Sequence, residues 1–207
     1  MTQNGDKGSA ELVRCRVERS IEVKKKLLAD LVYQGQVIRA ADEMLKSLRA
    51  GGTIFFFGNG GSAADAQHLA AEFTGRYLKE RRPLPALALS VNSSSVTAIG
   101  NDYGFDQVFS RPLEALGKAS DVAVGITTSG NSPNVVHALR VAKEKSMFTM
   151  ALTGGKGGAV AQVADCTICI PSEETPRIQE CHILTGHIIC ELVERAIVDE
   201  SSRVLGS

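Results

Sequence analysis

Residues 53–62 read TIFFFGNGGS, a continuous apolar run that ends in a polar, glycine-rich loop. Such a run is typical of a parallel strand buried on both faces, and the loop indicates a turn into a helix. The arrangement returns at 122–126 (VAVGI), which is followed by TTSGNS and another helical pattern. The sequence therefore predicts an α/β class domain, doubly wound around a mainly parallel sheet.

Extending the same reading along the chain gives five strand–helix units. We expect strands at 53–57, 84–89, 122–126, 148–152 and 166–170. Helices are expected at 62–78, 95–99, 105–116, 133–145 and 176–199, with a short helix after TGGKGG at 153–158. Two further helices precede the first strand between residues 10 and 50, with a break predicted at Gly35. Residues 1–9 have little to bury and are predicted to be disordered, leaving 10–207 as a single domain.

The composition excludes several classes of partner. Lys plus Arg and Asp plus Glu both total 23, so the formal net charge is zero. That balance offers no general attraction for nucleic acid or for an anionic membrane. No membrane span is evident, and the first thirty residues contain no unbroken apolar stretch of the kind a secretory signal needs.

The cysteines indicate a reducing compartment. Their number, five, is odd and their spacing fits no disulfide framework, which favours the cytoplasm. Cys166 and Cys169 form a CxxC, but they lie in an apolar strand-like run where a separation of three places them on opposite faces. We expect core roles for them in preference to a metal or redox role.

The loop TTSGNS at 127–132 crowds hydroxyls at the start of a helix. Thr127, Thr128, Ser129 and Ser132 lie between a buried strand and Pro133, and a serine followed by proline marks a helix start. Hydroxyls and free backbone N–H groups at the positive end of a helix dipole form a site for an anion. The loop lacks the lysine of a P-loop, so a phosphate monoester is favoured over a nucleotide. The alternative is that the hydroxyls only cap the helix.

The loop GNGGS at 58–62 has a similar composition. Asn59 and Ser62 could contact sugar hydroxyls. Ser62 and Asp65 also have the spacing of a capping box, so a plain capped turn is an equal alternative.

The helix after GNGGS carries His68 and Glu72, which are four residues apart and share one face. This pair could hold a divalent metal, or Glu72 could act as a general base. An exposed surface pair is the alternative, but the small and apolar flanking residues predict a largely covered helix. The last helix carries Gln179, His182 and His187. Gln179 and His187 are separated by a rise of roughly 12 Å, so they share one metal only if their side chains converge or two subunits contribute.

Five motifs together resemble the phosphoheptose isomerase family of SIS proteins. They are GNGGSAADAQHLAAEFTGRY at 58–77, GND at 100–102, GITTSGNSPNV at 125–135, ALTGGKGG at 151–158 and RIQECHI at 177–183. The resemblance covers nearly the whole chain from about residue 20, with the motifs in the family's order.

The resemblance implies a flavodoxin-like SIS domain with a five-stranded parallel sheet, and a homotetramer with active sites at subunit interfaces. It implies an isomerase that converts D-sedoheptulose 7-phosphate to D-glycero-D-manno-heptose 7-phosphate through an enediol, the first step of bacterial heptose biosynthesis. It further implies one zinc ion per subunit.

By position, the residues that match the family's zinc ligands are His68, Glu72, Gln179 and His187. Glu72 and His187 also match its proton-transfer residues. The positions that match substrate contacts are Asn59, Gly60, Ser62, Glu72, Asn101, Asp102, Thr127, Thr128, Ser129, Ser132 and Gln179. Pro176 is a departure, since some members carry an acidic substrate contact at this position.

Two other functions compete with the isomerase. Some relatives are non-catalytic proteins that associate with the bacterial replication initiator, but they lack the glutamate that Glu72 supplies here. A sugar-phosphate sensor of a regulator would usually need an attached DNA-binding domain, and residues 1–50 are too short and too charge-balanced to resemble one.

Overall fold

The computed structural model describes residues 3–205, and the side chains of residues 8–201. In chain order the elements are α1 (Gln3–Ala29), α2 (Leu31–Arg49), β1 (Ile54–Gly58), α3 (Gly61–Thr74), β2 (Ala86–Ala88), α4 (Ser93–Asp102), the 3-10 helix η1 (Phe105–Gln107), α5 (Ser110–Leu116), β3 (Val122–Thr127), α6 (Pro133–Glu144), β4 (Phe148–Gly154), the 3-10 helix η2 (Ala159–Gln162), β5 (Cys166–Ile170) and α7 (Thr175–Leu205).

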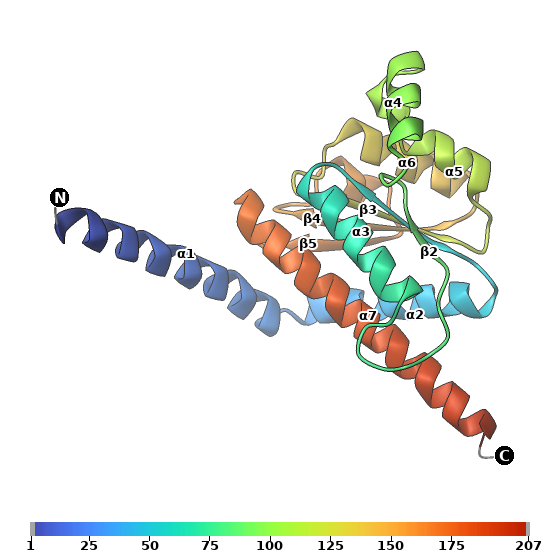
Figure 1. Ribbon diagram of the computed structural model, residues 1–207, viewed down its shortest axis with the longest axis horizontal. Coiled ribbons are helices and arrows are strands. Elements are labelled where there is room, and N and C mark those ends of the chain that lie inside the picture. The colour runs from blue at the N-terminus through green and yellow to red at the C-terminus, as the bar shows by residue number, and fades with distance from the viewer. Residues whose placement is uncertain (1–2, 206–207) are drawn as a thin grey trace.

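The five strands form one parallel sheet in the order β2-β1-β3-β4-β5, which confirms the predicted fold class (Figure 1). From β1 the chain moves outward to β2, and then returns to the other side of β1 to form β3, β4 and β5. The strand order therefore reverses between β1 and β3. In open α/β sheets, ligands bind at the carboxyl ends of the strands where this reversal occurs.

The side chains of β1 divide between two core layers. Ile54 and Phe56 pack on one face of the sheet with residues of α2, α3 and α7. Phe55 and Phe57 pack on the other face with residues of α5 and α6. All five residues of β1 are buried, as its unbroken apolar run predicts. Truncating a phenylalanine such as Phe56 to alanine should lower the free energy of unfolding by about 3–5 kcal/mol.

The two N-terminal helices differ from the prediction in two places. The break between them lies at Asp30, not at Gly35, which is inside α2. Asp30 Oδ1 accepts hydrogen bonds from the backbone N–H groups of Val32 (2.9 Å) and Tyr33 (3.1 Å). This cap satisfies the first donors of α2, whereas an exposed glycine inside a helix costs only about 1 kcal/mol.

Residues 3–9, which were predicted to be disordered, form the first part of α1 in the structure. Once a helix is nucleated, each further residue loses its backbone freedom but gains one hydrogen bond. A helix can therefore extend beyond the part that packs against the core. Residues 1–2 lie outside the described residues.

Only the end of α1 joins the core. Val23 and Leu27 are buried against Ile170 and Ile178, whereas the earlier turns project away from the sheet (Figure 1). The projecting part exposes apolar side chains at Leu12, Val13, Val17 and Ile21. Among the described residues, no helix combines the length and apolar character needed to cross a membrane.

Helix α3 ends at Thr74, four residues before the predicted end at Leu78. The backbone N–H groups of Tyr77 and Leu78 donate instead to the carboxylate of Glu194 on α7. The helix is capped by Gly75, a local stop signal that the prediction passed over, while the contact with Glu194 is not visible in the local sequence. The segment after α3 is thereby attached to the last helix.

Candidate active site

The two polar loops predicted to form the site lie side by side. In the sheet register Gly58, the last residue of β1, is paired with Ile126 of β3. Asn59 and Asn134 also exchange two side-chain hydrogen bonds of 2.9 Å each, which join the first loop to the start of α6. Both loops therefore meet where the strand order reverses.

The hydroxyl loop, residues 127–132, holds its polar groups close together. Thr127 Oγ1 lies 2.9 Å from Ser132 Oγ and 3.5 Å from Ser129 Oγ. Gly130 has φ +70, and a Cβ there would lie 2.1 Å from the carbonyl oxygen of Gly157. Only glycine fits this contact, since both the backbone angle and the space exclude a side chain.

Ser132 occupies the N-cap position of α6 as predicted, with Pro133 in the first turn, but its side chain makes no capping hydrogen bond. Its hydroxyl pairs with Thr127 instead. The serine therefore does not compete for the first backbone N–H groups of α6. Such groups at a helix N-terminus favour binding of an anion.

A cavity of about 420 Å³ opens beside the hydroxyl loop. Thr128 and Ser129 line it, together with Lys156 from the loop after β4 and Glu173 from the loop before α7. Lys156 and Glu173 were not predicted as site residues. The glycine-rich stretch TGGKGG at 153–158, a polar loop following a buried strand, was the available signal for Lys156.

The loop at 58–62 does not form the predicted capping box. Gly60, with φ 55 and ψ −120, is the N-cap of α3, and no side chain caps the helix. Ser62 is inside the helix and buried, because the glycines allow the chain to turn earlier.

Burial raises the pKa of Asp65, although the nearby His68 opposes this effect.

The close packing of α3 on α7 brings the predicted histidines together. A Cβ on Gly186 would lie 2.5 Å from Leu69 Cδ2, so the glycine lets the two helices approach. His68 Nε2 then lies 2.8 Å from His187 Nε2 and 3.2 Å from Glu72 Oε1. One ligand atom from each of these residues lies within 4.8 Å of the others, and we call them the His–Glu–His cluster.

The surroundings of the cluster favour a neutral His187. Burial and the neighbouring His68 lower the pKa of His187, while Glu72 acts in the opposite direction. The ring of Tyr77 stacks on His187 at a centroid distance of 5.4 Å and an interplanar angle of 29°. Two imidazole nitrogens and a carboxylate oxygen facing one point form a donor set that suits zinc.

The predicted covering of α3 is incomplete. The side chain of His68 is 49% exposed and that of Glu72 is 19% exposed. The helix buries Ala66, Leu69, Ala70 and Phe73, which lie on the face toward the core. The cluster therefore lies at the surface of this chain, within reach of a small molecule.

Gln179 lies apart from the cluster. A Cβ built on Gly61 would be 2.4 Å from Gln179 Nε2, which places the amide against the first turn of α3. His68 is seven residues further along α3, a rise of about 10 Å. Gln179 and His187 are eight residues apart on α7, which corresponds to a rise of about 12 Å.

Asn101 and Asp102 lie at the end of α4, where Asn101 Nδ2 donates to Asp102 Oδ1 at 2.8 Å. Both side chains are exposed. Asp102 lines a groove with Tyr103 and Arg111, and the Arg111 guanidinium lies 3.7 Å from the centre of the Tyr103 ring. No described hydrogen bond joins this pair to the hydroxyl loop.

The remaining cysteine and histidine candidates belong to the core. Cys166 is buried and Cys169 is half-buried on the other side of β5, as their spacing predicts. His182 is fully buried, and its Nε2 lies 3.2 Å from the carbonyl oxygen of Thr153. Burial lowers the pKa of His182 to about 4, so this ring is neutral at pH 7.

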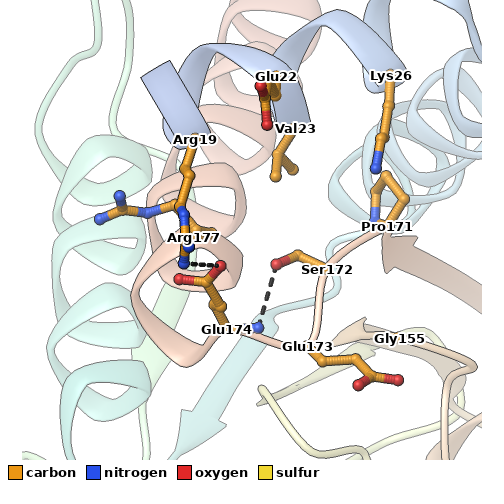
Figure 2. A pocket seen from close by; sticks show the side chains of 10 residues that line it. All are labelled: Arg19, Glu22, Val23, Lys26, Gly155, Pro171, Ser172, Glu173, Glu174 and Arg177. Carbon is orange, nitrogen blue, oxygen red and sulfur yellow. Dashed lines mark hydrogen bonds and ion pairs between the residues drawn. The ribbon is translucent and has the colours of Figure 1, made fainter. Parts of the chain in front are cut away.

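A second cavity of about 590 Å³, which shares Glu173 with the first, lies between α1 and the loop that precedes α7 (Figure 2). Charges of both signs line it, among them Arg19, Lys26, Glu173 and Glu174. Arg19 and Glu174 form an ion pair of 3.0 Å across it. It contains none of the predicted site residues.

Comparison with protein families matches a SIS domain over residues 22–154. The chain therefore belongs to the SIS-domain class of α/β proteins.

Curated relatives identify the family within that class. The chain is 51% identical over 191 residues to the phosphoheptose isomerase of Aquifex aeolicus, covering 92% of this chain and 99% of the relative. It is 56% identical over 161 residues to the phosphoheptose isomerase of Rhodospirillum rubrum, covering 78% of this chain and 86% of the relative. A solved phosphoheptose isomerase from Neisseria gonorrhoeae has 46% identity and a TM-score of 0.84, covering 90% of this chain and 98% of that one. This chain belongs to the phosphoheptose isomerase family and is an isomerase. The comparisons give no support to the non-catalytic alternative.

Proposed function

We propose that this enzyme converts D-sedoheptulose 7-phosphate to D-glycero-D-manno-heptose 7-phosphate through an enediol. The observation that carries the proposal is the His–Glu–His cluster, which gathers a carboxylate and two imidazoles at the surface of the fold. The relatives named phosphoheptose isomerase support the substrate.

The reaction moves one proton between neighbouring carbons. A base removes a proton from C1 of the ketose, an enediol forms, and C2 receives a proton while the oxygens exchange theirs. We assign the carbon proton to Glu72 and the exchange at oxygen to His187, because these two groups face one region from different helices.

We further propose one zinc ion per subunit, held by His68, Glu72 and His187, with Gln179 as a fourth ligand. The donor types fit zinc, and the mutual 4.8 Å limit on the three ligand atoms leaves them close enough to share an ion. Bound zinc would supply a Lewis acid that polarises the substrate's carbonyl oxygen. Gln179 lies apart from the three other ligands within one chain. The Gln179 of a second subunit could therefore complete the site.

The phosphate is assigned to the hydroxyl loop. Thr127, Thr128, Ser129 and Ser132 present hydroxyls at the start of α6, and Lys156 adds a positive charge to the adjoining cavity. Asn59, Gly60, Ser62, Asn101 and Asp102 are assigned to the sugar hydroxyls. Holding the distant phosphate would position the reacting end of the sugar.

A homotetramer with sites at subunit interfaces is part of the proposal. Glu72 lies eleven residues beyond Gly61, so α3 carries it about 16 Å away from the edge where the loops meet. An extended seven-carbon sugar with its phosphate spans only about 10 Å at a C–C bond of about 1.5 Å. The loop of one subunit and the cluster of another would satisfy both ends of the substrate. The apolar side chains of the projecting α1 offer a surface for such assembly.

We also propose a cytoplasmic enzyme at the first step of bacterial heptose biosynthesis. The five free cysteines support a reducing compartment.

The test is a coupled turnover assay on sedoheptulose 7-phosphate, with metal analysis of the purified protein. We expect turnover, loss of turnover on treatment with a chelator, and recovery when Zn²⁺ is returned. Absence of turnover by the zinc-loaded protein would overturn the isomerase assignment. Full activity in the chelator would overturn the zinc assignment alone.

A further inference from the structure

Glu194 is a buried carboxylate that the proposed chemistry does not use. It lies on α7, two turns beyond His187, and is 1% exposed. Its Oε1 accepts a hydrogen bond from the backbone N–H of Tyr77 (2.8 Å), and its Oε2 accepts from those of Leu78 (2.7 Å) and Lys79 (2.8 Å). Burial raises the pKa of Glu194, but these three donors and Arg81 outweigh it, and the pKa is lowered overall. The group is therefore an ionised carboxylate bound to three consecutive peptides.

Arg81 links the same carboxylate to α3. Its Nε lies 3.2 Å from Glu194 Oε1, and both side chains are buried. Its Nη2 donates to the carbonyl oxygen of Glu72 at 2.7 Å, and its Nη1 donates to those of Phe73 and Gly75. Arg81 thus satisfies the last carbonyl groups of α3, including the carbonyl of Glu72, a member of the cluster.

Tyr77 is the point at which this arrangement reaches the cluster. Its backbone N–H is fixed by Glu194 and its ring stacks on His187. The torsion that turns an imidazole ring about its Cβ–Cγ bond is broad, so the ring plane depends on neighbouring groups. Tyr77 covers one face of the ring whose Nε2 lies 2.8 Å from His68 Nε2.

We propose that Glu194 is a positioning residue of the active site, which holds Tyr77 so that the Tyr77 ring fixes the orientation of His187. An apolar residue at position 194 would fill this buried part of α7 without the cost of burying a charge. The carboxylate instead fixes the backbone of residues 77–79 through three hydrogen bonds. The fixed backbone in turn determines where the Tyr77 ring lies. This inference deepens the proposed function and rests on it for its kinetic consequences.

The first test reads the orientation of His187 without activity or metal. In protein carrying ¹³C-labelled histidine, the stacked Tyr77 ring shifts the His187 Hε1 signal, and Tyr77→Leu defines its position without that ring. We expect Glu194→Gln to move the signal toward the Tyr77→Leu position, because its amide places a donor where the carboxylate accepts. If Glu194→Gln does not fold, Glu194→Asp, which retracts the carboxylate, serves the same test. A His187 signal that stays at its wild-type position in a folded variant overturns the proposal.

The second test asks whether Glu194 acts through Tyr77. We expect Tyr77→Leu to lower kcat about tenfold to hundredfold with little change in KM, since small misplacement of a catalytic group has effects of this size. Tyr77→Phe, which keeps the ring, should restore both turnover and the His187 signal. In the Tyr77→Leu background, Glu194→Gln should lower the melting temperature without a further loss of kcat.

Equal losses of kcat in both backgrounds would show that Glu194 acts by another route and would overturn the proposal. Arg195→Ala is the matched control, because it removes an exposed ion pair with Glu191 from the neighbouring position of α7. It should leave the His187 signal and kcat unchanged. If wild-type protein shows no turnover, the proposed function fails, and the His187 signal still decides the role of Glu194.

Discussion

The hydroxyl loop is made from six consecutive residues, whereas the His–Glu–His cluster joins side chains as far as 119 positions apart. The loop follows a buried strand, its hydroxyls pair with one another, and Gly130 fixes its path against Gly157. The cluster depends on the packing of two helices and is half-exposed at His68. One region is shaped by local sequence, and the other by tertiary contacts.

This difference suggests a division of labour. A loop with its polar groups already in place is suited to holding a phosphate that does not react. A cluster whose members approach from two helices is suited to proton transfer, because each group can be placed independently around the reacting carbons. Substitutions in the two regions should therefore affect binding and turnover differently.

The largest expected effect is on turnover, from Glu72→Gln. The amide keeps the shape of the side chain but cannot accept the carbon proton, so kcat should fall about 10²–10⁴-fold. KM for sedoheptulose 7-phosphate should change much less than kcat, because the hydroxyl loop that is assigned the phosphate is untouched. Steady-state kinetics and a thermal melt measure the two quantities, and wild-type kcat in this variant would remove Glu72 from the mechanism.

His182 links the helix that carries part of the cluster to the strands that carry the hydroxyl loop. It lies on α7 with the cluster residue His187, yet its Nε2 contacts the carbonyl oxygen of Thr153, which pairs with Thr127 in the sheet. Burial lowers the pKa of His182 from 6.5 to about 4 in the folded protein. Between these values the unfolded chain binds a proton that the folded chain does not. Stability should therefore decrease as pH falls from 6.5 to 4, by about 3 kcal/mol in total.

His182→Gln removes this titration while keeping an amide donor for Thr153. Denaturant unfolding at pH 7 and pH 4.5 should show a smaller difference for the variant than for the wild type. His137→Gln, which makes the same substitution at a half-buried histidine of α6, is the matched control. An unchanged pH dependence in His182→Gln would assign the effect to other groups.

The same contrast explains what could be predicted from sequence. The strands follow from their unbroken apolar runs, and the hydroxyl loop from its place between such a run and Pro133. The pairing of His68 with Glu72 follows from helical spacing. Each of these signals is contained within a few consecutive residues.

The missed features depend on contacts that span the chain. Glu194 binds Tyr77, just after the end of α3, from more than a hundred positions away, and no local pattern marks this contact. The approach of α7 to α3 depends on Gly186, which reads in sequence as an ordinary helical glycine. Lys156 enters the loop cavity because β4 lies next to β3, a neighbour relation that requires the strand order.

The smallest expected effect concerns the loop itself. Thr127→Val keeps the shape of a buried strand residue and removes one hydroxyl, which pairs with Ser132 in the free protein. One hydrogen bond to a charged phosphate is worth about 1.5 kcal/mol or more, so KM should rise roughly tenfold. If loop and cluster divide the work as argued, kcat should remain near the wild-type value in the same assay. A loss of kcat equal to that of Glu72→Gln, with KM unchanged, would show that the loop takes part in the chemistry and that the division is wrong.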